Sequence, residues 1–81
     1  MSESTLKPPR RFQLTAEYDA NIDMLYVFAP GYSSKSPPAV SATDAFKTKF
    51  GEVFFDGDFE GKLAGIEIPN ASQCIKVPLE K

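Results

Sequence analysis

The sequence contains no histidine and only one cysteine, Cys74. Without histidine, the chain lacks the usual general base near neutral pH and the commonest transition-metal ligand. Ser-His and Cys-His nucleophile pairs are therefore impossible within one chain, and a structural zinc site is implausible. A single cysteine excludes an intrachain disulfide and suits a reducing compartment. We expect a chain that is not an enzyme by itself and that binds no cofactor.

The sequence also lacks a long apolar segment. We therefore expect neither a secretion signal nor a transmembrane span, and we expect a cytoplasmic protein. The formal net charge is −2, whereas a dedicated nucleic-acid binder usually shows a clear basic face. Lys7, Arg10 and Arg11 form a small basic cluster, which we interpret as a solvated chain end. The sequence thus predicts no nucleic-acid partner and no membrane partner.

The length of 81 residues predicts one domain with a modest core. A chain of this size buries only about 60–65% of its unfolded surface, so it is marginally stable by itself. Small cores are often completed by a disulfide, a metal or a partner chain. Residues 1–9 are polar and end in two prolines, and we interpret them as a disordered arm. Residues 10–81 are expected to form the single domain.

Two strands are predicted in the first half of the chain. Phe12, Leu14, Ala16 and Tyr18 alternate with polar residues, which is typical of a half-buried strand. Residues 19–23 form a connection rich in Asp and Asn, which favour turns. Residues 24–29 are apolar throughout and indicate a central strand paired with the first. Residues 30–43, which hold three prolines and four serines, are expected to form a long loop.

The second half predicts two further strands. We expect a strand over residues 46–55 with a bulge near Gly51, or alternatively a short helix within residues 42–50. Residues 63–68 form the fourth strand, which Pro69 ends. Asn70 or Ser72 could cap one helical turn through Ile75, and Pro78 prevents a longer helix. The predicted fold is mainly β, at most a β-rich α+β fold, with a single antiparallel four-stranded meander.

A set of turn and strand residues resembles a known family, the domain of unknown function numbered 2283. The shared pattern is a Tyr-Asp turn, an Asp before Leu-Tyr, and a Gly-Ile-Glu-Ile strand that ends in Ala-Ser. The resemblance spans about residues 12–75 and implies a short β-rich chain with no assigned activity. Relatives continue with helix-compatible residues where this chain has Pro78, and they lack its long loop. The residues that carry the resemblance are Tyr18, Asp19, Asp23, Leu25, Tyr26, Asp56, Gly61, residues 65–68, Ala71 and Ser72.

The acidic segment 56–67 approaches the spacing of an EF-hand calcium loop. Acids stand at loop positions one, three, five and twelve, and Gly61 stands at position six. The flanking residues, however, favour strands, whereas an EF-hand needs helices on both sides. We interpret the segment as a solvated acidic turn. The alternative is a module that binds calcium or a small ligand with this turn and the loop of residues 30–43. The candidate metal ligands are Asp56, Asp58, Glu60 and Glu67.

Other acidic residues allow a catalytic interpretation and a structural one. Asp19 and Asp23 could join the acids of segment 56–67 at one end of the sheet, where paired carboxylates could act as acid and base. So small a sheet leaves little room for a ligand pocket of ~300–1,000 Å³, and we favour turn capping. Glu67 is expected to pair across the sheet with Arg11, Lys49 or Lys62, or to lie in an interface.

Aromatic residues are abundant, with seven Phe and three Tyr. One sheet without a substantial helix cannot easily bury them all, and exposed aromatic patches usually mark association surfaces. We therefore expect a small interaction or regulatory module that forms a homodimer or binds a small partner protein. The predicted interface residues are Phe28, Phe46, Phe50, Phe54 and Phe55.

Overall fold

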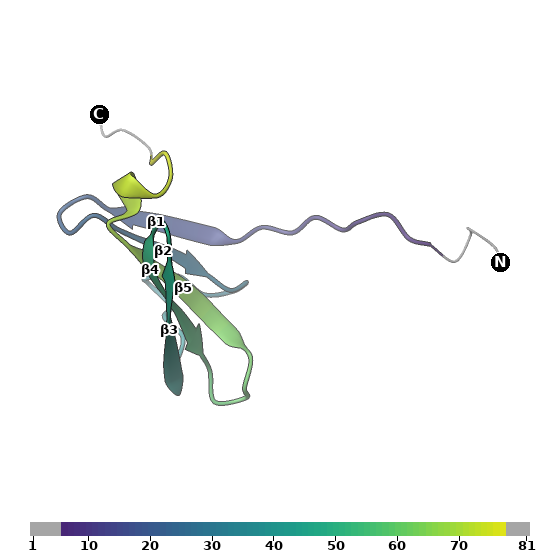
Figure 1. Cartoon of the computed structure of the whole chain (residues 1–81). Coiled ribbons are helices and arrows are strands. Elements are labelled where there is room, and N and C mark those ends of the chain that lie inside the picture. The colour runs from purple at the N-terminus through teal and green to yellow at the C-terminus, as the bar shows by residue number, and fades with distance from the viewer. Residues whose placement is uncertain (1–5, 78–81) are drawn as a thin grey trace.

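Five strands form one open antiparallel sheet in the computed structural model, which describes residues 6–77 (Figure 1). The strands are β1 (Thr15–Asp19), β2 (Met24–Phe28), β3 (Ala42–Thr48), β4 (Gly51–Gly57) and β5 (Leu63–Pro69). One 3-10 turn, η2 (Ala71–Gln73), follows β5. The mainly β prediction is confirmed, whereas the predicted number of four strands is wrong. Part of the predicted arm (residues 1–5) and Pro78 lie outside the described residues.

The fifth strand appears where the sequence predicted one bulged strand over residues 46–55. This segment is a tight hairpin between β3 and β4. Gly51 has φ +130°, a conformation that favours glycine. The Thr48 hydroxyl donates to the Gly51 carbonyl at 2.7 Å and accepts from the Phe50 N–H at 3.0 Å. Gly51 therefore follows a turn between two strands, and the alternative helix within residues 42–50 is also wrong.

The strand order β1-β2-β5-β4-β3 differs from a simple meander. β2 pairs with β5, so residues 29–41, here called the crossing loop, must pass from the middle of the sheet to its far edge. The apolar character of β2 and β5 explains this order, because the two most apolar strands lie next to each other near the centre. Leu25 lies opposite Ile68, and Val27 lies opposite Ile66. The predicted bulge is absent at Gly51, but a register shift occurs between Asp56 and Gly57.

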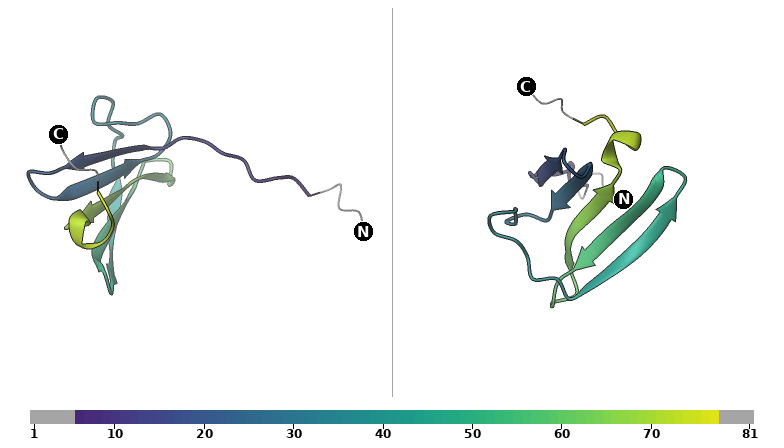
Figure 2. Two further views of the ribbon diagram at one scale, coloured as in Figure 1. Left: turned by 90° about the horizontal axis from the view of Figure 1, so that it is seen from above. Right: turned by 90° about the vertical axis from the view of Figure 1, so that its left-hand side faces the viewer.

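The alternating segment that begins at Phe12 becomes a paired strand only at Thr15. Thr15 lies opposite Phe28, the last residue of β2, and Pro30 cannot donate to a continued ladder. Residues 6–14, here called the arm, therefore have no partner strand and contain no helix or strand. Figures 1 and 2 show the arm running away from the sheet in an extended path. The chain consequently has a radius of gyration of 15.7 Å, against about 12 Å for a compact domain of this length.

The register divides the strand side chains between two different faces, because residues directly opposite each other share a face. One face, here called the apolar face, carries only one charged strand residue, Asp44. The other, here called the acidic face, carries six charged strand residues. The large side chains of the apolar face are Tyr18, Leu25, Val27, Phe46, Val53, Phe55, Ile66 and Ile68. The charged residues of the acidic face are Glu17, Asp19, Lys47, Glu52, Asp56 and Glu67.

The hydrophobic core of the described chain is small. Its buried hydrophobic residues are Leu25, Ala64 and Ala71, and no large side chain is fully buried. The chain exposes 6861 Å², whereas a compact monomer of 8.9 kDa exposes about 4,800 Å². The extended arm and the exposed Phe46 and Phe55 of the apolar face both contribute to this excess. Within residues 6–77, no helix is long and apolar enough to cross a membrane.

Candidate functional site

Asp23 joins the β1–β2 turn to the end of β5. Its carboxylate accepts hydrogen bonds from the Tyr18 hydroxyl (2.7 Å), the Ser72 N–H (3.0 Å) and the Ser72 hydroxyl (2.7 Å). The Asp23 carbonyl also accepts from the Ala71 N–H at 3.0 Å. The hydrogen bonds from Tyr18 and then Ser72 lower the pKa of Asp23. Residues separated by 49 positions are thus held together, which gives Tyr18, Asp23, Ala71 and Ser72 a structural role.

The neighbouring Asp19 has the local role that the sequence predicted. Its carboxylate accepts from the Asn21 N–H at 3.0 Å and so caps the turn. Asp23 does not cap a turn in this way. It has φ +54°, a left-handed conformation that Asp tolerates better than most residues. Asp19 and Asp23 therefore serve different structural purposes.

Asp56 and Glu67 form a carboxyl pair on the acidic face. Asp56 lies opposite Gly65 and Glu67 lies opposite Phe54, so the two acids are diagonal neighbours on β4 and β5. Asp56 is only 8% exposed and accepts from the Thr43 hydroxyl at 2.7 Å. A hydrogen bond with Asp56, then burial and the Asp56 charge, raise the pKa of Glu67 to about 7. Glu67 thus pairs with an acid, and the prediction of a partner among Arg11, Lys49 and Lys62 is wrong.

A cavity of about 600 Å³ opens beside this pair, in the size range of ligand sites. The Tyr26 and Phe28 rings, stacked with centroids 6.0 Å apart, form part of its wall. The prediction that the sheet leaves little room for a pocket is therefore wrong. The crossing loop builds the missing wall, and its Ser34 N–H donates to the Glu17 carboxylate at 3.2 Å. The lining includes Glu17, Asp19, Tyr26, Phe28, Ser34, Pro37, Pro38, Val40, Asp56 and Glu67.

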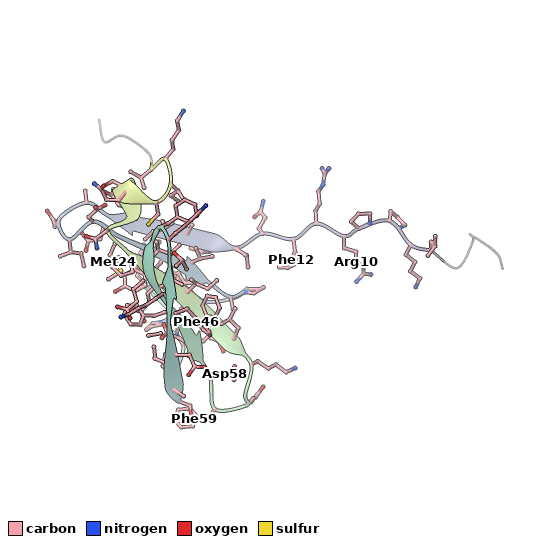
Figure 3. The ribbon with its side chains drawn as sticks, viewed as in Figure 1. Arg10, Phe12, Met24, Phe46, Asp58 and Phe59 are labelled. Carbon is pink, nitrogen blue, oxygen red and sulfur yellow. The ribbon has the colours of Figure 1, made fainter. Side chains whose placement is uncertain are left out.

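The acidic turn after β4 is organised by Asp58, which is labelled in Figure 3. The Asp58 carboxylate accepts from the backbone N–H groups of Glu60 and Lys62, both at 2.9 Å. Strands β4 and β5 flank the turn, so it lacks the helices of an EF-hand. Within residues 6–77, no group of three or more acidic or cysteine side chains is placed to hold a metal ion. Of the four candidate ligands, only Asp56 and Glu67 are brought together as a pair.

The five predicted interface residues are distributed over three places. Phe46 and Phe55 lie together on the apolar face, with ring centroids 5.0 Å apart and exposed fractions of 47% and 38%. Phe28 and Phe54 belong to the acidic face. Phe50 lies in the β3–β4 turn, where the Lys49 ammonium is 5.5 Å from the centre of its ring. The sequence therefore grouped these five residues as one interface, whereas the structure places them in three different environments.

Sequence reasoning missed the residues that make the cavity. Glu17 and Tyr26 were not among the candidates, because each belongs to an ordinary strand pattern. The loop of residues 30–43 was a candidate only as a whole, without its prolines being singled out. Two signals were present in the sequence. The loop is unusually long, and Tyr26, Phe28 and Glu67 fall at alternate positions of neighbouring apolar strands.

No protein-family model matches this chain, and no curated protein or solved structure gives a significant match. The resemblance to the domain of unknown function numbered 2283 therefore stays a prediction. The described geometry offers two surfaces with distinct chemistry. The apolar face can bury hydrophobic area against another protein, and the cavity of the acidic face can receive a cationic group.

Proposed function

We propose that the protein is a small non-catalytic interaction module that pairs with a second copy of itself through the apolar face. The observation that carries this proposal is the Phe46–Phe55 pair, which lies exposed on a face with one charged strand residue. Residues 6–77 bury only three hydrophobic residues, so the chain gains hydrophobic stabilisation by covering this face. The absence of histidine from the sequence supports a non-catalytic role.

A second copy fits this face in size and character. Strands five to seven residues long, spaced ~4.8 Å apart, form a face of about 20 Å by 20 Å. With its projecting side chains, such a face approaches the ~800 Å² that each partner of a stable dimer buries. Two-fold symmetry would place the same patch on both partners. The one charged strand residue of the patch, Asp44, lies opposite Phe55 on the edge strand β3, where its carboxylate can stay in contact with solvent. The product would be a two-layer sandwich of sheets ~10 Å apart.

Light scattering after size-exclusion chromatography tests this proposal on the native chain and two variants. The native chain should elute with twice the mass of 8.9 kDa. Phe46→Lys should elute as a monomer, because it places a charge in the aromatic pair of the proposed interface. Phe59→Lys should remain a dimer, because Phe59 lies in the β4–β5 turn although it is 76% exposed (Figure 3). A monomeric native chain at micromolar concentration would refute the proposal.

A further inference from the structure

The arm continues the side-chain pattern of β1 beyond the end of the sheet. Phe12 and Leu14 line a small apolar cavity together with Val27 and Ile66, so their side chains lie on the side of the apolar face. Because successive side chains of an extended chain point to opposite sides, Arg11 lies on the side of the acidic face. The arm therefore extends both faces of the sheet, although β2 ends before it.

The arm and β1 together form an extended segment, residues 11–19, with a free edge. In the described part of the chain, β1 is a terminal strand and the arm makes no backbone–backbone hydrogen bond. The Ala29 N–H donates to the Ala64 carbonyl at 2.9 Å, so odd-numbered residues of β2 direct their backbone groups toward β5 and even-numbered ones toward β1. By the register of β1 with β2, Ala16 and Tyr18 then direct theirs away from the sheet. Such unpaired groups are a template for another strand.

We propose that two copies pair through this edge, with residues 11–19 of one copy antiparallel to the same residues of the other. A two-fold axis at Thr15 sets Phe12 of each copy opposite Tyr18 of the other. Both of these residues direct their backbone groups outward, so each such pair can exchange two hydrogen bonds. Pro9 lies beyond the last pair, where its missing N–H costs no hydrogen bond. The product is one continuous sheet, in which the apolar faces of both copies form a single surface.

The charged side chains match across this pairing. In a two-fold pair of strands, directly opposite residues lie on the same face. The axis therefore sets Arg11 opposite Asp19 on the acidic face, where a guanidinium can form paired hydrogen bonds with a carboxylate. The other edge strand, β3, offers no such match, because its Asp44 and Lys47 lie on opposite faces. Charge complementarity thus selects the β1 edge and a second copy as its partner.

This edge pairing goes beyond the proposed dimer and does not depend on it. A contact between single strands involves far fewer residues than the roughly 20–30 that each partner contributes to a standard interface. The edges should therefore pair only above the micromolar concentrations at which the apolar faces pair. Because each proposed dimer carries one such edge on either copy, edge pairing would join dimers into larger assemblies.

Disulfide trapping at several hundred micromolar protein tests the edge and its register. The background carries Cys74→Ser, which removes the native thiol, and Phe46→Lys, which blocks the proposed pairing of apolar faces. Thr15→Cys places two thiols opposite each other at the axis, with a Cα separation of about 4.5 Å that a disulfide accepts. The matched Gln13→Cys, also at an exposed position, places them at least about 13 Å apart. In a glutathione buffer, Thr15→Cys should form crosslinked dimers at least about tenfold faster.

A charge exchange in the Thr15→Cys chain tests the Arg11–Asp19 contact. Arg11→Asp sets two acids opposite each other and should slow the crosslinking by about tenfold. The matched Arg10→Asp changes the net charge equally but lies beyond the last pair, so it should have a much smaller effect. Combining Arg11→Asp with Asp19→Arg should restore the rate, because the opposite charges face each other again.

Two results would overturn the edge pairing. Thr15→Cys could crosslink no faster than Gln13→Cys, or Arg11→Asp could slow the crosslinking no more than Arg10→Asp does. Since the background already blocks the apolar faces, either result leaves the proposed dimer standing. If the native chain is instead a monomer at micromolar concentration and Thr15→Cys still crosslinks as predicted, only the proposed dimer fails.

Discussion

The two faces of the sheet use the same five strands for opposite purposes. The acidic face is covered in part by the crossing loop, and it holds a buried acid, Asp56, whose polar contacts are made within the chain. The apolar face carries an aromatic pair, Phe46 and Phe55, that remains exposed. The acidic face is thus covered in part by the chain itself, whereas the apolar face buries Leu25 and Ala64 but leaves its aromatic pair on β3 and β4 exposed. This difference is the reason to look for a partner at the apolar face.

Neighbouring residues on one strand give the sharpest comparison, because successive side chains point to opposite faces. Phe54 and Phe55 are adjacent on β4, so each reports on one face. Phe55→Lys should raise the dimer dissociation constant by at least about 100-fold, as expected for charge at the centre of an interface. Phe54→Lys should leave the dimer intact. Sedimentation equilibrium measures both, and dissociation of both variants to the same extent would contradict the assignment of the faces.

The Asp23 junction consists of the hydrogen bonds that Asp23 accepts from Tyr18, Ala71 and Ser72. Among the contacts outside the two faces, it should contribute most to the stability of the fold. Asp23→Ala removes the acceptor for Tyr18 and Ser72 and leaves alanine in a left-handed conformation. We expect the melting temperature to fall by roughly 5–10 °C. Asp19→Ala, which removes one turn contact, should have a much smaller effect. If the two substitutions lower the melting temperature equally, the stabilising role of the Asp23 junction would be contradicted.

Acid should also weaken the Asp23 junction. The native contacts lower the pKa of Asp23 below its ordinary value of 3.8. A carboxyl group with a lowered pKa adds stability above its ordinary value, and that stability is lost as the pH falls through the lowered value. The stability difference between the native chain and Asp23→Ala should therefore shrink below pH 4. Urea denaturation at a series of pH values measures it.

The carboxyl pair predicts the opposite pH dependence on the acidic face. The pKa of Glu67 is raised from its ordinary value of 4.5 to about 7, so the native state binds more protons than the unfolded state between these values. Stability from the Glu67–Asp56 hydrogen bond is present below pH 4.5 and is lost as the pH rises to 7. Because Glu67 is partly exposed to screening solvent, we expect a loss of about 1 kcal/mol. In urea denaturation, the Glu67→Gln variant should show no loss of unfolding free energy between pH 4.5 and 7. If its unfolding free energy changes with pH as steeply as that of the native chain, the Asp56–Glu67 pair would be refuted.

The acidic turn should give the smallest effect. Asp58→Ala removes two hydrogen bonds to backbone N–H groups in an exposed turn, and it should destabilise the chain by about 0.5–1 kcal/mol. Because strands flank the turn, millimolar calcium should leave the melting temperature of the native chain unchanged. A rise with calcium in the native chain that Asp58→Ala abolishes would restore the calcium interpretation of residues 56–67.

Local patterns in the sequence predicted much of the sheet. The alternation in β1, the apolar run of β2 and the end of β5 at its proline all follow from backbone and side-chain rules that act over a few residues. Gly51 was harder to interpret, because glycine suits both a bulge and a hairpin turn. Only the pairing of β3 with β4 distinguishes the two, and pairing is a tertiary property.

The candidate site could be predicted far less well than the strands. Glu67 and Asp56 are 11 positions apart in the chain, and their contact depends on the register in which β4 pairs with β5. The cavity depends on the crossing loop returning over the acidic face, which the strand order imposes and the loop sequence does not encode. The aromatic count predicted an exposed patch, but only the register separates Phe46 and Phe55 from Phe54.

An isotope-filtered NMR experiment tests the pairing of two apolar faces most directly. Labelled and unlabelled native chains are mixed, and only contacts between different chains are recorded. We predict contacts from the Ile66 methyl groups of one copy to the Phe46 and Phe55 rings of the other. Pairing through the apolar faces would be contradicted if no contacts between chains are found, or if the contacts arise only from Phe28 and Phe54 on the acidic face.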